Sequence, residues 1–207
     1  MNNKKPFLVG ISGGSGCGKT TILKALFDAM PNGSLALVSQ DDYYLPIEQQ
    51  PLDHNGKENF DLPASLDEKQ FVQDLNQLLN NQRVEIIEYT FNNDAKQASL
   101  KIVEPAPIVI VEGLFVFHYE DIYKQMDYKV FVEACEKTRL ARRLVRDEKE
   151  RGYPREDVLY QWKHHVEPAY HEFLKPYIPA CDLIINNDEH YQDDLTKLVE
   201  HLKQIID

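Results

Sequence analysis

The segment from Gly13 to Thr20 constrains the fold of this chain most, because it matches the pattern G-x-x-x-x-G-K-[S/T]. A strand-like run, Phe7 to Ile11, comes directly before it, and Ile22 to Met30 has the spacing of an amphipathic helix. In that setting the glycines let successive backbone N–H groups point at phosphate oxygens, and the helix N-terminus adds its positive dipole. A glycine-rich turn with a chance Lys-Thr pair is the alternative. We expect a strand, a loop and a helix that bind the phosphates of a nucleotide.

Two further groups are expected to complete this nucleotide site. Lys19 should reach the outer phosphates of ATP, and Thr20 should hold the accompanying magnesium ion. The apolar run Ile108 to Val111 ends in Glu112, which we expect to organise the same Mg²⁺. The alternative is a strand-end carboxylate that is merely solvated. The nucleotide-binding residues predicted from the loop are Gly13, Gly14, Ser15, Gly16, Cys17, Gly18, Lys19, Thr20 and Thr21.

Short apolar runs alternate with longer helical patterns along the chain, which is typical of a parallel sheet. Because the apolar residues are consecutive, both faces of each strand should be covered by helices. The sequence therefore predicts an α/β fold, a P-loop NTPase three-layer α/β/α sandwich with a mostly parallel sheet. The strand-like runs are Phe7 to Ile11, Leu35 to Val38, Ile108 to Val111, Val130 to Val132 and Leu183 to Ile185.

The length of 207 residues favours a single domain, residues 1–207, with attached flaps. A capping box of Ser65 and Glu68 is predicted to open a helix that runs to about Asn80. Two strand-like runs between Val84 and Val103 flank the turn-forming residues 92–94, and they indicate a β-hairpin insertion over about 84–103.

Composition excludes several classes of partner. The net charge of -11 repels polyanions, so we expect no nucleic acid. No run of about 18 apolar residues is present, so we expect no membrane span. The N-terminus lacks the pattern of a secretory signal, which predicts a cytoplasmic protein. The three cysteines are widely spaced and odd in number, and we expect them to be reduced.

The phosphate loop alone does not fix the reaction. The N-K-x-D run that reads guanine is absent, as is the L-S-G-G-Q run of transporter ATPases, so a kinase of small molecules is favoured. Such a kinase needs a carboxylate near the acceptor hydroxyl. Asp41 follows the run Leu35 to Val38, whose end should open beside the phosphate loop. Asp42 is the competing candidate for this carboxylate. The simplest alternative is that Asp41 and Asp42 are both ordinary turn residues with no catalytic role.

Six of the seven arginines fall between Arg139 and Arg155. The spacing of Arg139, Arg142, Arg143 and Arg146 places three of them along one face of a helix. A lid over about 146–154 that carries arginines to the transferring phosphate fits this pattern. The alternative is a solvated face balanced by nearby acids. The seven histidines, His164, His165 and His171 among them, are expected on the surface or on helix faces, and no protein-bound transition metal is implied.

Several segments together resemble the uridine kinases, also called uridine-cytidine kinases, from about Phe7 to Ile185. The segments that carry the resemblance are Gly10 to Thr20, Ser39 to Tyr44, Asn59-Phe60-Asp61, Val111-Glu112-Gly113, Thr138 to Arg143, Arg146-Asp147, Glu150-Arg151-Gly152, and Gln161 with Val166 to Phe173.

The resemblance implies a role for each matching residue. Asp41 would be the catalytic base, assisted by Lys19 and Arg146, and Asp61 would grip the ribose hydroxyls. By the same resemblance, Tyr89 would face the base, and Arg143 and Gln161 would contact other parts of the substrate. The phosphates would be bound by Arg146 and Arg151, and Mg²⁺ by Glu112. It also implies ATP as the donor, a nucleoside acceptor in pyrimidine salvage, and a homo-oligomer, the tetramer usual in the family.

Three segments depart from the family pattern. The family has a histidine and an arginine after its hairpin tyrosine, whereas here the chain reads Thr90 to Lys96, with Asp94 near the place of the histidine. Tyr153 stands in place of a lid arginine, and residues 186–188 replace a Pro-Arg-Gly sequence. Ser39 to Tyr44 also resembles nicotinamide riboside kinases. That activity, or that of another small-metabolite P-loop kinase, is one alternative, and a non-catalytic ATP-binding sensor is another.

Overall fold

The protein is built on a five-stranded sheet in the order β2-β5-β1-β6-β7, with every neighbouring pair parallel. The computed structural model describes residues 4–90 and 98–206. All five strand-like runs of the sequence are strands of this sheet, so the predicted parallel α/β fold is confirmed. The strands are β1 (Phe7–Ser12), β2 (Leu35–Ser39), β5 (Ile108–Glu112), β6 (Tyr128–Glu133) and β7 (Leu183–Asn186).

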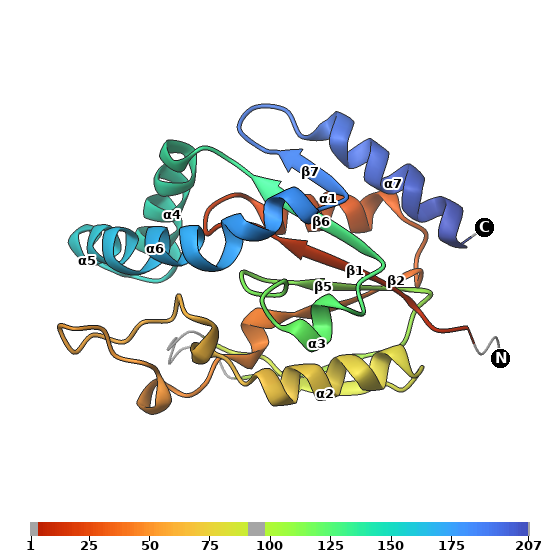
Figure 1. Cartoon of the computed structure of the whole chain (residues 1–207), viewed down its shortest axis with the longest axis horizontal. Coiled ribbons are helices and arrows are strands. Elements are labelled where there is room, and N and C mark those ends of the chain that lie inside the picture. The colour runs from red at the N-terminus through yellow and green to blue at the C-terminus, as the bar shows by residue number, and fades with distance from the viewer. Residues whose placement is uncertain (1–3, 91–97, 207) are drawn as a thin grey trace.

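Helices cover both faces of the sheet, as Figure 1 shows. The helices are α1 (Lys19–Ala29), α2 (Glu68–Leu79), α3 (Glu120–Tyr123), α4 (Glu136–Glu150), α5 (Arg155–Gln161), α6 (Glu167–Ala169) and α7 (Gln192–Ile206). Strand residues alternate between two buried clusters. Val9 and Ile11 pack with α1 and α7 on one face, and Leu8 and Val109 pack with α2 and α3 on the other. The predicted three-layer arrangement follows from this double burial.

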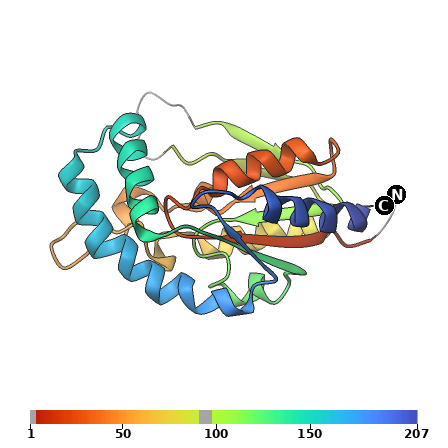
Figure 2. The ribbon, with the colours of Figure 1, turned by 90° about the horizontal axis from the view of Figure 1, so that it is seen from above.

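A long irregular helical segment runs from α5 to the end of a 3-10 helix at Ala180. It lies beside α4 at the carboxyl ends of the strands, away from the two chain termini (Figure 2). The same edge receives the chain between β2 and α2, which contains three short 3-10 helices. The shorter helical elements are the 3-10 helices Gln40–Tyr43, Ile47–Gln49, Pro63–Ser65 and Lys175–Ala180, and the π-helices Trp162–Val166 and Tyr170–Leu174.

The start of α2 corrects the predicted capping box. The N-cap residue is Asp67, whose carboxylate accepts a hydrogen bond from the backbone N–H of Gln70. Ser65 belongs instead to the 3-10 helix Pro63–Ser65, and its hydroxyl donates to the carbonyl of Asn59 at 2.7 Å. An ionised carboxylate at the N-cap also complements the helix dipole, which a serine does not.

The hairpin insertion is confirmed as an antiparallel pair, β3 (Val84–Ile87) with β4 (Leu100–Val103). Its predicted turn at residues 92–94, with the departure at Asp94, lies outside the described residues. The segment expected as a lid, 146–154, begins inside α4, and its last four residues connect α4 to α5. Closure by this segment stays a prediction.

The three cysteines lie in three different environments. Cys17 is buried, Cys135 is exposed and Cys181 is half-buried, and all three are free. Within residues 4–90 and 98–206, every helix is too short or too polar to reach across a bilayer.

The cap of α2 gives the first test. We expect Asp67→Ala to lower the free energy of unfolding by about 1 kcal/mol, because the orphan N–H of Gln70 loses its acceptor. Lys69→Ala, an exposed substitution in the same turn, should change stability by well under half of that. Chemical denaturation of the two variants and the wild type measures both effects. Equal losses in both variants would contradict the assignment of Asp67 as the cap.

Candidate active site

A cavity of about 330 Å³ opens at the carboxyl ends of β1, β2 and β5. It brings together most of the residues that the sequence singled out. The predicted residues that line it are Ser15, Gly16, Gly18, Lys19, Thr20, Thr21, Asp41, Asp61, Tyr89, Glu112, Arg143, Arg146, Arg151 and Gln161. Parts of the chain that lie far apart in the sequence therefore meet around one space.

The phosphate loop has the backbone that its glycines permit. Gly16 and Gly18 have φ angles of 79° and 94°, a region that residues with a Cβ rarely adopt. Gly18 is the N-cap of α1, so the N-terminus of that helix faces the cavity. The Lys19 ammonium donates to the carbonyl of Gly13 at 2.8 Å, which holds the side chain across the loop. Backbone N–H groups, a helix dipole and a cation therefore converge where phosphates would bind.

Three residues of the predicted loop, Gly13, Gly14 and Cys17, pack against the rest of the protein and do not line the cavity. A Cβ on Gly13 would collide with the carbonyl of Val132, so only glycine fits there. Gly14 lies beneath Arg139. Cys17 is fully buried, so its thiol is part of the core and not of the phosphate site.

Two carboxylates lie beside the loop, Glu112 at the end of β5 and Asp41 just after β2. Ser39 is the register partner of Glu112 in the sheet, and its hydroxyl donates to Glu112 at 2.6 Å. The backbone N–H of Asp41 also bonds to that hydroxyl, at 3.3 Å. Burial, together with the charge of Asp41, raises the pKa of Glu112 to about 7. Burial likewise raises the pKa of Asp41, although Lys19 opposes the rise.

This pair of carboxylates fits a divalent cation. Burial raises the pKa of both carboxyls, and the charge of Asp41 adds to the rise at Glu112, so a bound cation would favour their charged forms. Oxygen ligands are also those that Mg²⁺ prefers. The Thr20 hydroxyl lines the same cavity and adds a third oxygen. The predicted metal ligands, Thr20 and Glu112, are thus suitable in type and location.

Asp42 points away from the cavity, unlike Asp41. Both of its carboxylate oxygens lie 3.0 Å from the Lys101 ammonium, and it accepts a hydrogen bond from the backbone N–H of Tyr89. It lines a separate groove beside β3. Asp42 therefore ties the hairpin to the start of the loop, and Asp41 alone of the two faces the phosphate loop.

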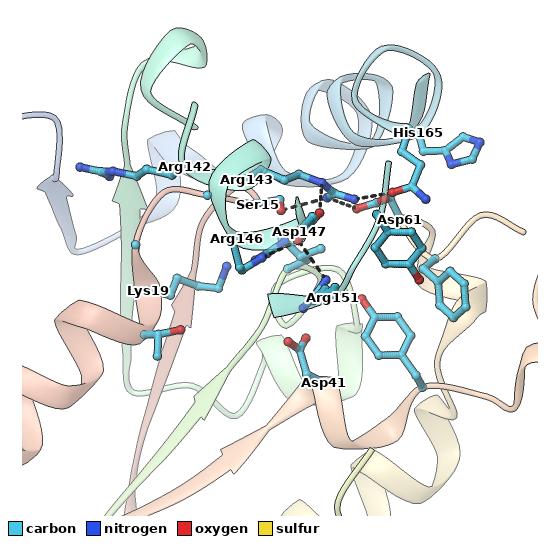
Figure 3. A pocket seen from close by; sticks show the side chains of 18 of the residues that line it. Ser15, Lys19, Asp41, Asp61, Arg142, Arg143, Arg146, Asp147, Arg151 and His165 are labelled. Atoms are coloured by element: carbon cyan, nitrogen blue, oxygen red, sulfur yellow. Dashed lines mark hydrogen bonds and ion pairs between the residues drawn. The ribbon is translucent and has the colours of Figure 1, made fainter. Parts of the chain in front are cut away.

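Asp147 holds an arginine cluster over the other side of the cavity, as Figure 3 shows. Its side chain is fully buried, with oxygens 2.7 Å from Nε of Arg146, 3.1 Å from Nε of Arg143 and 3.6 Å from Arg151. In the same view Lys19 and Asp41 point toward this cluster from the opposite wall. One buried anion thus fixes three cations that face the space above the phosphate loop.

Arg143 connects the cluster to the substrate side. It donates to the Ser15 hydroxyl and to the side-chain carbonyl of Gln161, each at 3.0 Å, and lies 3.6 Å from a carboxylate oxygen of Asp61. Asp61 is itself only 7% exposed, with one edge on the cavity. Three of the residues predicted for substrate contact, Asp61, Arg143 and Gln161, are therefore one connected group.

The helix α4 does not present one positive face to solvent. Arg139 is 3% exposed, pairs with Glu167 at 2.9 Å and stacks 4.1 Å over the ring of Tyr170. Arg142 donates to the carbonyls of Asn187 and Cys17 behind the phosphate loop. The solvated alternative is wrong for Arg139 and for the buried Arg143.

Aromatic rings form the end of the cavity beyond Asp61. Tyr44 lies 5.8 Å from Phe60 and 5.5 Å from Tyr89, centroid to centroid. Tyr153, which replaces a lid arginine of the family, lines the same cavity. Such rings offer apolar faces of about the size of a planar base.

Sequence reasoning missed His165 and undervalued Asp147. His165 is 3% exposed, lines the cavity, and has its Nε2 2.8 Å from a carboxylate oxygen of Asp53. Of the two predicted placements, the helix face is therefore right and the surface is wrong for this histidine. Its position four residues after Gln161 on a helical pattern was the available signal. From the sequence alone, Asp147 is named only in the Arg146-Asp147 segment of the family resemblance and is given no role of its own.

Comparison with known proteins places this geometry in a family. Residues 8–192 match the model of the phosphoribulokinase / uridine kinase family. The chain belongs to this family. Among curated proteins it is similar to a uridine kinase of Ligilactobacillus salivarius, 32% identical over 98% of this chain and 95% of the relative. A uridine kinase of Streptococcus pyogenes is 34% identical over 88% of each chain. The resemblance inferred from the motifs is thereby confirmed.

Solved structures of the same fold agree with the three-layer architecture. A possible uridine kinase from Bacillus stearothermophilus superposes with a TM-score of 0.63 at 17% identity, over 89% of this chain and 90% of that one. A D-glycerate 3-kinase from Cryptococcus neoformans superposes with a TM-score of 0.62 at 17% identity, over 91% and 88% of the two chains. At this identity the likeness shows the fold alone.

The pKa of Glu112 gives a test by pH. Its value of about 7 in the folded protein exceeds the ordinary 4.5, so between these values the folded protein binds more protons than the unfolded chain. The contribution of Glu112 to stability therefore falls as pH rises from about 4.5 through 7. In metal-free buffer we expect Glu112→Gln to be more stable than the wild type at pH 8, by on the order of 1 kcal/mol or more, with the gap narrowing toward pH 5. Urea unfolding at both pH values measures this, and a gap independent of pH would contradict it.

Proposed function

We propose that this protein phosphorylates the 5'-hydroxyl of a nucleoside with ATP, and that uridine or cytidine is the preferred acceptor. The observation that carries the proposal is a single cavity with a phosphate loop at one end, Asp61 and Arg143 at the other, and Asp41 on its wall. Membership of the family and the names of the relatives support the same reaction.

Asp41 is the proposed catalytic base. Burial raises its pKa, so the carboxylate is a better proton acceptor than an exposed aspartate, while the charges of Lys19, Arg151 and Arg146 oppose the rise. It accepts the proton of the 5'-hydroxyl as that oxygen bonds to the terminal phosphorus of ATP, and ADP leaves. A carboxylate near the acceptor and in line with the phosphate is what this transfer needs.

Lys19, Arg146 and Arg151 neutralise the charge of the moving phosphoryl group. The two arginines are preorganised by Asp147, so little reorganisation is needed when the charge develops. Thr20 and Glu112 would hold Mg²⁺, which supplies further neutralisation of the phosphate oxygens when bound. Arg151 and the loop residues also bind the nucleotide in the ground state.

Asp61 is proposed to accept hydrogen bonds from the two ribose hydroxyls. A buried carboxylate on vicinal hydroxyls makes two charge-assisted bonds, which discriminates against an acceptor that lacks one hydroxyl. Gln161 and Arg143 hold the neighbouring part of the substrate, and Tyr89 faces the base. A sensor that only binds ATP would need neither this carboxylate nor Asp41.

A panel of acceptors tests the proposal directly. ADP release is measured with ATP and Mg²⁺ alone, and then with uridine, cytidine, adenosine, nicotinamide riboside or pantothenate. Release that depends on a pyrimidine nucleoside is the expected result, and mass spectrometry of the 5'-monophosphate identifies the product. Release with nicotinamide riboside alone would favour that kinase, and no release with any acceptor would favour the sensor. The cytoplasmic location and the tetramer stay predictions.

Asp41→Asn tests the assignment of the base. We expect turnover to fall by a factor on the order of a hundred or more, because the amide cannot accept the proton. ATP binding, measured by calorimetry, should change little. Asp42→Asn is the matched control, since Asp42 bonds to Lys101 outside the cavity and should retain most of the turnover. A larger loss in Asp42→Asn than in Asp41→Asn would reassign the base.

A further inference from the structure

The loop 51–58 forms a small hairpin of its own at the open end of the cavity. The backbone N–H of Asp53 donates to the carbonyl of Lys57 at 2.8 Å, and the backbone N–H of Gly56 donates to the carbonyl of Asp53 at 3.0 Å. Leu52 and Glu58 form an isolated antiparallel bridge, and the N–H of Asn59 closes the loop onto Pro51 at 2.7 Å. Figures 1 and 2 show this loop reaching out beside α5, far from the sheet.

Asp53 joins this loop to the helical segment across the gap. Its carboxylate accepts hydrogen bonds from the Tyr160 hydroxyl at 2.6 Å and from the backbone N–H groups of Asn55 and Lys57 at 2.8 and 2.9 Å. Nε2 of His165 is 2.8 Å away as a further donor. The side chain of Asp53 is only 7% exposed. The hydrogen bond from Tyr160, with help from His165, holds the pKa of this carboxyl below its ordinary value, so the bonds are made to a carboxylate.

A second contact lies at the surface beside the first. The Lys57 ammonium sits 4.3 Å over the ring of Tyr160 and 3.4 Å from a carboxylate oxygen of Asp157. Both charged groups of that pair are more than 40% exposed, so the pair itself contributes little. The side-chain amide of Asn55 also donates to the Tyr160 hydroxyl. Asp53 supplies the buried, charged part of the docking.

The two segments joined by Asp53 are opposite walls of the acceptor end of the cavity. The loop leads directly into Phe60 and Asp61, and the helical segment carries Gln161 and His165. Asp53 and Tyr160 stand outside this lining. On the inner side, Asp61 and Gln161 are connected through Arg143. The walls are thus tied twice, once within the cavity and once behind it.

We propose that the loop 51–58 is a clasp in which Asp53 acts as a positioning residue for the nucleoside site. By bonding to Tyr160 and His165 it fixes the distance between Phe60 and Asp61 on one wall and Gln161 on the other. A wall fixed in advance lowers the entropy lost when the acceptor binds. This role rests on the proposed function, since it presumes that the acceptor is held between these walls.

The phosphate end is held by different interactions, which makes the role testable. Lys19 is fixed by the loop carbonyl of Gly13, and Arg146 and Arg151 are fixed by Asp147. Loss of the clasp should therefore raise the KM for the nucleoside and leave the KM for ATP unchanged. A residue that merely supports the fold would affect both substrates and the melting temperature together.

The experiment compares Asp53→Asn, Tyr160→Phe and the double variant with the wild type. The first substitution keeps a side-chain oxygen for the loop's own N–H groups, and the second removes only a hydroxyl. We expect the KM for uridine to rise about fivefold to tenfold in Asp53→Asn and about threefold or more in Tyr160→Phe, which is the net size of one ordinary hydrogen bond. The KM for ATP should stay within about twofold, and the double variant should be less than additive.

Asp157→Asn is the matched control, because it removes only the exposed partner of Lys57 in the same contact. Its KM for uridine should remain near that of the wild type. An unchanged KM for uridine in both clasp variants, or an equal rise in both KM values, would overturn the proposal.

Hydrogen exchange separates failure of the clasp from failure of the proposed function. In Tyr160→Phe we expect faster exchange at the amides of Asp53 and Asn59, with no change at the amides of β1. Exchange at wild-type rates would disprove the clasp even in an active kinase. If the wild-type protein phosphorylates no nucleoside, the proposed function fails and so does the positioning role, whatever the exchange shows.

Discussion

The arrangement of the active site depends on one buried ionic interaction, that of Asp147 with Arg143, Arg146 and Arg151. A fully buried carboxylate is costly unless it is paired, so its presence obliges the three guanidinium groups to stay around it. Three positive charges against one negative charge leave the cluster cationic. This explains how a chain with a net charge of -11 can present a binding site for polyphosphate. The attraction is local, and the rest of the surface still repels large polyanions.

The sheet supplies the opposing wall. Because β2 and β5 are parallel neighbours with Ser39 beside Glu112, their carboxyl ends deliver two acids to the edge where the phosphate loop begins. The same hydroxyl of Ser39 bonds to both Glu112 and the backbone of Asp41, so the two acids are set relative to each other before any ligand binds. Burial raises the pKa of both acids, and the nearby charge of Asp41 adds to the rise at Glu112. The site combines acids at the strand ends with arginines from α4, and the phosphates would lie between them.

Much of the fold and part of the site could be predicted from sequence because those features are local. Five runs of consecutive apolar residues were sufficient to predict the sheet and its layers. One glycine motif, with its flanking strand and helix, was sufficient to predict the phosphate loop. The cap of α2 was misassigned because the S-x-x-E pattern says nothing about the 3-10 helix that takes up Ser65. The pairing of His165 with Asp53 spans 112 positions, and no periodicity encodes such a contact. Helical spacing gave the face on which the arginines lie, but not that Asp147 is their common partner.

The walls of the cavity differ in how strictly they can select a substrate. One wall offers charged or amide groups in fixed positions, those of Asp61, Arg143 and Gln161. A substrate that leaves such a group without a hydrogen-bond partner binds much more weakly, because a buried polar group is costly when unpaired. Tyr44 and Phe60 offer ring faces, and stacking is tolerant of which planar base is present. We therefore expect the sugar to be discriminated more sharply than the base. On this reasoning, substitutions in the aromatic wall should alter which base is accepted, whereas replacement of Asp61, the carboxylate proposed to meet the ribose, should abolish the reaction.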